Sequence, residues 1–175
     1  MGQFESFSAY FLRLLTIETF AQIVIWFGLL VLLRKPLSRL LKLTIAQTVW
    51  FAAALSGIIA FTIRIGDGNG TSDKFWLFDP LLWSIVSDVG ANWALNALLF
   101  IPTAFLLTLF GKKPWIVFAS LLALSALLET VQTITRVGVG DPSDFVANCI
   151  GTLGGVLLGL LIRTLLHKRK NGLNR

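Results

Sequence analysis

Charged side chains are scarce in this sequence, and so are the residues that most enzymes use for metal or nucleophilic chemistry. Only 14% of the 175 residues are charged, and there is one cysteine and one histidine. A single cysteine, Cys149, excludes an internal disulfide, and a single histidine, His167, excludes the His-rich spacings of zinc sites. The sequence also lacks a phosphate-binding glycine loop and a nucleophile elbow. We therefore predict neither a metal nor another cofactor.

Long apolar runs dominate the sequence instead. Hydrophobic residues make up 55% of the chain and the mean hydropathy is +0.79, which is too apolar for a soluble domain. Each run has about the ~20 residues that a helix needs to cross a bilayer. We predict a single domain, residues 1–175, folded as an all-α polytopic integral membrane bundle of about five transmembrane helices. The runs occupy residues 16–33, 43–63, 93–111, 114–134 and 145–166.

The charges are divided between the connections of these runs. The first and third connections and the C-terminal region contain cations and no acidic residue, whereas all nine acidic residues fall on the other side. By the positive-inside rule, we predict a multi-pass protein of the bacterial cell membrane with its N-terminus outside and its C-terminus in the cytoplasm. The net charge of +6 then serves orientation and contact with anionic lipid, not nucleic acid. The cations concerned are Arg34, Lys35, Arg39, Lys42, Lys112, Lys113, Arg163, Lys168, Arg169, Lys170 and Arg175.

Two further segments have the pattern of interfacial structure. Residues 4–15 mix aromatic and polar side chains at near-helical spacing, which predicts an N-terminal interfacial helix. Residues 75–83, before the third run, are rich in aromatic side chains but too short to span. We expect this second segment to be interfacial or re-entrant.

Polar side chains gather near the outer ends of the last three runs, at spacings that place those of each run on one helical face. A carboxylate at a helix centre in the bilayer costs about 2.5 to 3.5 kcal/mol on insertion scales, so Glu129 needs a partner or a proton. One candidate partner is Arg136, about two turns further along the same helix. The alternative is a neutral Glu129 that is hydrogen-bonded to Asn96 or Asn148 on a neighbouring helix. The alternative is that these groups only hold the helices together. The candidate ligand-binding residues are Asn96, Glu129, Gln132, Arg136, Asp144 and Asn148.

Helix packing accounts for a different set of residues. Gly151, Gly155 and Gly159 recur every four residues in the fifth run, the spacing at which small residues let two transmembrane helices approach closely. Pro102 within the third run frees a backbone carbonyl one turn earlier and predicts a kink.

An ordered set of these positions, within residues 92–160, resembles the signature of the VanZ-like membrane proteins. The chain departs from that pattern at Ala104, where the family usually has glycine, and in a longer segment between Arg136 and Asp141. The resemblance implies an integral membrane protein linked to low-level resistance to the glycopeptide antibiotic teicoplanin. The matching positions are Asn96, Phe100, Pro102, Ser125, Glu129, Gln132, Arg136, Asp141, Asp144, Asn148, Gly151 and Gly155.

The sequence favours a role other than catalysis. Residues 138–141 match the GxGD motif of intramembrane aspartyl proteases, but that chemistry needs two carboxylates facing each other within the bilayer, and Asp141 lies in a connection. Two functional classes stay open. In the first, the polar site binds or shields a cell-envelope component, such as a lipid-linked cell-wall precursor or a lipoglycopeptide, with membrane lipids as its surroundings. In the second, the protein is a small transporter or a membrane-embedded enzyme for lipid-linked intermediates, with Glu129 as the titrating group.

Overall fold

The structure, a computed structural model, describes residues 16–63, 91–135 and 141–172, and within these ranges all regular structure is helical. This confirms the predicted all-α class. The segments predicted to be interfacial, residues 4–15 and 75–83, lie outside the described residues. The helices are α2 (Ile17–Leu32), α3 (Arg34–Leu41), α4 (Ile45–Thr62), α6 (Ala91–Leu109), α7 (Pro114–Thr135) and α8 (Pro142–Gly172).

Four of these helices, α4, α6, α7 and α8, are long and apolar enough to cross a membrane. The α2 and α3 helices together form a fifth candidate span, which is bent by 70° between the two. The described part of the chain thus has four to five candidate spans, in agreement with the predicted count of about five. The chain is a multi-pass membrane protein.

The α3 helix occupies residues that the sequence suggested were a plain connection. It is amphipathic: Ser38 is buried, whereas Lys35 and Arg39 are exposed. Its end is set by Lys42, whose left-handed backbone (φ 50°) directs its N–H to the carbonyls of Ser38 and Arg39. Because α3 turns by 70° from α2, a membrane-crossing α2 places α3 close to the plane of the membrane surface, where a basic amphipathic helix is stable.

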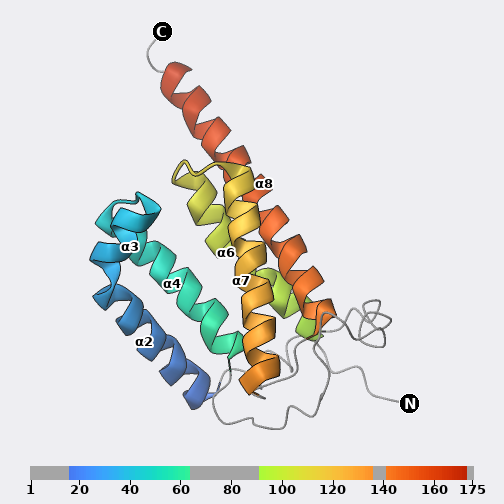
Figure 1. Cartoon of the computed structure of the whole chain (residues 1–175). Helices are drawn as coiled ribbons and strands as arrows, with labels where there is room; N and C mark the ends of the chain where they lie inside the picture. Colours follow the sequence, from blue (N-terminus) through green and yellow to red (C-terminus); the bar gives the residue numbers. More distant parts are fainter. Residues whose placement is uncertain (1–15, 64–90, 136–140, 173–175) are drawn as a thin grey trace.

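The helices form two groups joined through α6 (Figure 1). The most extensive contact is between α6 and α8, and α7 packs against α8 beside it. The α2 and α4 helices pack together, and α4 also contacts α6. Buried apolar side chains of four helices meet at the centre of this arrangement, with Phe51 and Ile58 from α4, Phe100 and Ala104 from α6, and others from α7 and α8.

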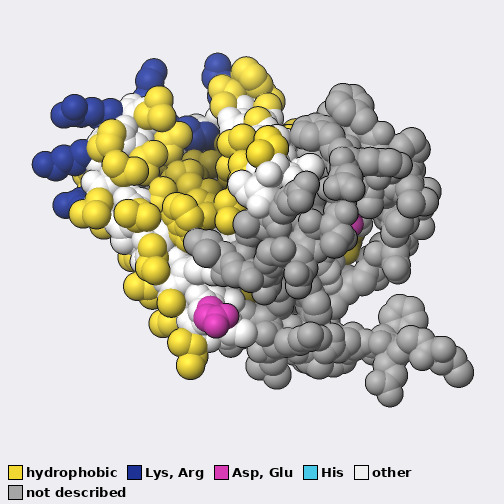
Figure 2. Space-filling view, turned by 60° about the horizontal axis from the view of Figure 1, so that its bottom comes forward, with side chains coloured by type: hydrophobic (Ala, Val, Ile, Leu, Met, Phe, Trp, Pro, Cys, Tyr) yellow, Lys and Arg dark blue, Asp and Glu magenta, His cyan; other side chains and the backbone are white. Residues whose placement is uncertain are grey.

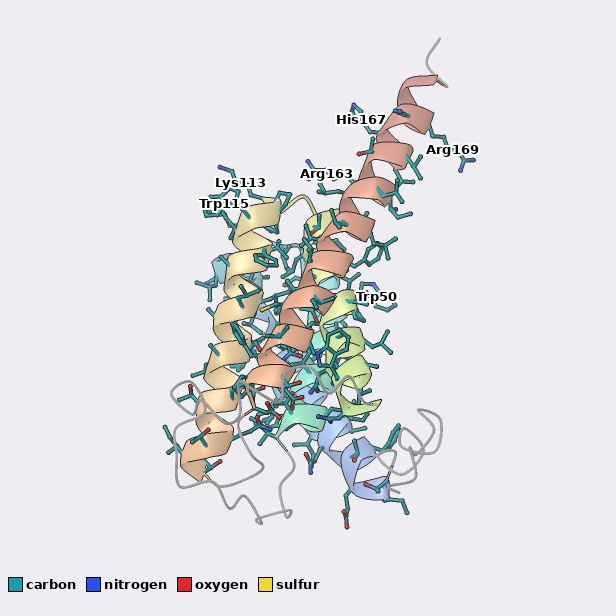
Figure 3. The ribbon with its side chains drawn as sticks, turned by 90° about the vertical axis from the view of Figure 1, so that its right-hand side faces the viewer. Trp50, Lys113, Trp115, Arg163, His167 and Arg169 are labelled. Atoms are coloured by element: carbon teal, nitrogen blue, oxygen red, sulfur yellow. The ribbon has the colours of Figure 1, made fainter. Side chains whose placement is uncertain are left out.

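Charge divides the molecule along its long axis. All Lys and Arg residues in the described ranges lie on α3, in the turn before α4, in the turn before α7, and on the last turns of α8. Together these segments form what we call the basic end (Figure 3). The acidic residues in the described ranges, Glu18, Glu129, Asp141 and Asp144, lie at the opposite end, which we call the carboxylate end. The assignment of the basic end to the cytoplasm remains a prediction.

Candidate functional site

The polar site is organised around the first turn of α8. Pro142 occupies the first helical position, where its missing N–H costs no hydrogen bond. Before it, the Asp141 Oδ1 atom accepts a hydrogen bond of 2.7 Å from the Ser143 N–H, which caps the helix. Asp144 is the acidic residue of the first turn, a position that the helix dipole favours. This local sequence therefore fixes where α8 begins and places two carboxylates at its N-terminus.

Glu129 of α7 reaches the same helix start. Its side chain is only 1% exposed, and its Oε2 atom accepts a hydrogen bond of 2.9 Å from the Asp141 N–H. The partner of Glu129 is thus a backbone donor at the N-terminus of α8, rather than the Asn96 or Asn148 amide that the sequence suggested. The Asp141 and Asp144 carboxylates are near enough to repel an ionised Glu129.

The α6 helix directs amide side chains to the Asp144 carboxylate. The Asn92 Nδ2 atom donates to the Asp144 Oδ1 atom at 3.0 Å. Asn96, one turn further along α6, lies near enough to stabilise the ionised form of this carboxylate. The face of α6 that carries Asn92 and Asn96 therefore points to α8.

A second polar layer lies one turn deeper along α7 and α8. The Asn148 Nδ2 atom donates to the Ser125 Oγ atom at 2.9 Å, and both side chains are buried. The Thr152 hydroxyl donates to the Asn148 carbonyl at 2.7 Å. This layer joins α7 to α8 with a side-chain hydrogen bond that is shielded from solvent.

Gln132 lies on the same stripe of α7 but turns to a different helix. Its Nε2 atom donates to the backbone carbonyl of Thr62 at 2.8 Å. Thr62 is the last residue of α4, where helical carbonyls lack an intrahelical partner. Gln132 thereby ties the end of α4 to α7 and closes one side of the carboxylate end.

Two oxygen atoms of this region are buried without a hydrogen-bond partner among the described residues. They are the Asn148 Oδ1 atom and the Gln132 Oε1 atom. Most buried side-chain oxygens in proteins are satisfied, and an unsatisfied one costs about 1 to 3 kcal/mol. The site therefore contains acceptors that lack donors beside a group of carboxylates.

The structure brings together four of the six candidate ligand-binding residues, Asn96, Glu129, Asp144 and Asn148, on three helices. Gln132 borders the group through α4, and Arg136 lies outside the described residues. Sequence reasoning did not place Asp141 or the Thr62 carbonyl in the site. Asp141 could have been identified, because an Asp before a proline is a common helix N-cap. The Thr62 carbonyl could not, because every residue has a backbone carbonyl and the sequence does not show which one accepts a bond. No three His, Cys, Asp or Glu residues within the described ranges are arranged to hold a metal.

The glycines of α8 determine how closely α6 approaches the site. A Cβ atom on Gly151 would overlap the backbone of Ala97, and one on Gly155 would overlap the Ile101 carbonyl. A Cβ atom on Gly159 would lie 2.8 Å from the Thr108 Cβ atom. Side chains at these positions would push the two helices apart. The fourth residue assigned to packing, Pro102, lies within α6.

Comparison with known proteins places the chain in one family. Searches of curated proteins and of solved structures found no match. The family model described as VanZ/LLP1 matches residues 19–163, which include α3, α4, α6 and α7, most of α2, and α8 as far as Arg163. The match covers most of the chain and agrees with the family resemblance of the sequence. The chain therefore belongs to the VanZ/LLP1 family.

Proposed function

We propose that the carboxylate end binds the headgroup of a cell-envelope component, such as a lipid-linked cell-wall precursor or a lipoglycopeptide of the teicoplanin type, and so shields it. The observation that carries this proposal is the pair of buried, unpartnered oxygens of Asn148 and Gln132 beside the carboxylates of Glu129 and Asp144. Buried oxygens without a partner also occur away from this site, at Gln22, Thr103 and Thr108, but those of Asn148 and Gln132 are the ones that lie beside carboxylates.

The unfilled positions define the chemistry of the ligand. The amide donors of this region already have acceptors. Asn92 donates to Asp144, Gln132 donates to the end of α4, and Asn148 donates to Ser125. The site therefore offers oxygen acceptors, and a ligand must bring hydroxyl or ammonium donors. Sugars carry hydroxyl donors, and free amino groups carry ammonium donors, so the headgroup of a glycosylated envelope component fits these requirements. Arg136 remains our candidate for an anionic group of the same ligand.

The test is a Glu129→Gln variant expressed in a bacterial host that is sensitive to teicoplanin. Glutamine fills the same volume, and its oxygen can still accept from the Asp141 N–H, so the protein should remain in the membrane at normal abundance. The carboxyl group that would meet a ligand donor is replaced by an amide, which accepts at one oxygen only, and we expect any protection against teicoplanin to disappear.

Glu18→Gln is the matched control. Glu18 lies at the same end of the molecule, in the first turn of α2, but its side chain is exposed. This control should leave teicoplanin susceptibility at the wild-type value. Wild-type protection by an abundant Glu129→Gln protein would contradict the proposal. Reduced abundance of Glu129→Gln, with proportionate loss of protection, would assign Glu129 to the scaffold instead.

A proton-coupled transporter or enzyme acting on lipid-linked intermediates is the second candidate. It is favoured by the grouping of Glu129 with Asp141 and Asp144, because buried carboxyl groups form the proton relays of many membrane transporters. Here Glu129→Gln should abolish the pH dependence of transport in reconstituted vesicles. Binding without transport requires no such change, so the two readouts separate the candidates.

A further inference from the structure

The basic end contains an apolar cleft that the proposed function does not use. The cleft has a volume of about 360 Å³ and lies between α3 and α4 on one side and α7 on the other. Leu107 of α6 lines it from between the two groups, and the neighbouring helices add Phe51, Leu55, Val117 and Leu121. Among the described residues that line the cleft, only Ser120 and Lys112 carry polar side chains.

In the described ranges, hydrogen bonds connect the ends of α4 and α7 and leave the cleft between them. At the carboxylate end, Gln132 bonds to the Thr62 carbonyl. At the basic end, the Lys112 Nζ atom donates to the Lys42 carbonyl at 2.8 Å, which connects the turn before α7 to the turn after α3. This second bond bridges the top of the cleft. Figure 2 shows hydrophobic side chains over much of the described surface and Lys and Arg side chains along its upper edge.

The dimensions of the cleft fit one lipid chain. The lining of α7 extends from its first turn, at Ile116, to Leu124, about 12 Å along the helix axis. This is most of the ~15 Å hydrocarbon thickness of one leaflet, half of the ~30 Å core. The volume lies within the range of about 300 to 1,000 Å³ that ligand pockets occupy.

The charge around the cleft selects the headgroup. The Lys112 ammonium has three donors, and the bond to the Lys42 carbonyl uses one of them. Arg39 and Lys42 belong to the same end, on and just after α3. In the described ranges this end has no acidic residue. A phosphate at the mouth of the cleft would therefore meet free donors and a positive field.

We propose that this cleft binds an anionic phospholipid of the leaflet at the basic end, with one acyl chain between α4 and α7 and its phosphate on Lys112. Water is excluded as the occupant because the walls offer it too few polar partners. The acyl chain supplies the van der Waals contacts that α4 and α7 do not make with each other along the cleft. This site is separate from the carboxylate end and does not depend on the ligand proposed there.

The experiment measures phosphatidylglycerol retained by the purified full-length protein, using native mass spectrometry. Lys112→Gln removes the phosphate donor, and Ser120→Trp fills the cleft from an exposed position on its wall. We expect Lys112→Gln to bind phosphatidylglycerol about tenfold more weakly than the wild type, the change expected from loss of one charge-assisted hydrogen bond. Ser120→Trp should also reduce the lipid retained, because the added ring occupies the space of the acyl chain. Lys112→Arg should retain the lipid.

The controls are adjacent residues that do not line the cleft. Lys113→Gln removes the same charge, and Ala119→Trp adds the same ring, both from exposed positions. Both should retain phosphatidylglycerol. A melting temperature in zwitterionic phosphatidylcholine that matches the wild type shows that a variant is folded, and Ser120→Trp against Ala119→Trp carries the test if Lys112→Gln is not folded. Equal retention by the Lys112→Gln and Lys113→Gln variants would overturn the proposal. Equal retention of phosphatidylcholine by the wild type, or a lipid-free dimer that Ser120→Trp disrupts, would also overturn it.

Discussion

The two halves of α7 show how differently a helix can meet its neighbours within one membrane protein. The half at the basic end, up to Leu124, faces an open apolar cleft on its α4 side. The half at the carboxylate end, from Ser125 onward, is bonded to α8 through Ser125 and Glu129 and to α4 through Gln132. Apolar side chains lose nothing by facing lipid, which is as apolar as they are, whereas polar groups must find partners in the protein. Polar positions therefore decide where these helices are held together.

The contact between α6 and α8 follows another rule, because it depends on shape. Gly151 and Gly155 bring the two backbones so close that a side chain could not be inserted. Ala104 lies against Gly155 and is fully buried. The VanZ-like pattern has glycine at this position, and the methyl group of Ala104 fits because Gly155 opposite has no side chain. Close packing of this kind positions Asn92 and Asn96 against Asp144.

The largest expected effect concerns the orientation of the two ends, because a topology reporter gives an all-or-none signal. Reporters fused after Lys42, after Lys113 and at the C-terminus should report the cytoplasm, and reporters at Gly70 and Gly138 the outside. Phosphatase and fluorescent-protein fusions measure this directly. A cytoplasmic signal at Gly70 would reverse the predicted orientation of the two ends, since the polar half of α7 would then face the cell interior.

The next effect concerns shape. Gly155→Leu should destabilise the folded protein by about 3 kcal/mol or more, because the added side chain must displace Ile101 and Ala104 of α6. Thermal unfolding in detergent measures the loss. Gly154→Leu is the control on the same helix, since a Cβ atom at Gly154 meets nothing within 4 Å. Similar losses from both variants would show that α6 and α8 are not in close contact.

A smaller loss should follow when the buried hydrogen bond of the polar half is removed. Ser125→Ala leaves the Asn148 amide without its partner, and we expect a loss between about 0.6 and 1.7 kcal/mol, the average and the maximum measured for hydrogen bonds between transmembrane helices. Ser120→Ala, in the cleft half of the same helix, should change the unfolding temperature little. If Ser120→Ala proved the more harmful change, polar contacts would not be what separates the two halves.

The smallest effect is expected for the bond at the edge of the site. Gln132→Leu removes the bond to the Thr62 carbonyl, whose loss we expect to cost about 0.6 kcal/mol, the average for such bonds. Thr135→Ala is the control, because the Thr135 hydroxyl bonds within its own helix, to the Val131 carbonyl. Faster hydrogen exchange at the end of α4 in Gln132→Leu alone would locate the effect, and unchanged exchange there would exclude a link between α4 and α7.

Much of the fold could be predicted because hydrophobic length and charge position are properties of the sequence itself. The five apolar runs correspond closely to α2, α4, α6, α7 and α8. The pattern failed at α3, because eight basic and apolar residues are too short to register as a span and look like a loop. Face-sharing within a helix was also predictable, as for Asp144 and Asn148. Pairing between helices was not. The partner of Glu129 depends on the axial register of α7 against α8, and no spacing within a single helix specifies that register.

The length of α8 sets the height at which a domain fused after this helix would stand. From Pro142 to Gly172 the helix measures about 46 Å, whereas the hydrocarbon core is ~30 Å thick. Arg163 lies about 32 Å from the helix start, so the first cation of α8 arrives where the hydrocarbon ends. The following turns continue past the bundle without a break (Figures 1 and 3). They form a rigid stalk, and a domain fused to it would be held away from the membrane surface at a fixed height and not on a tether.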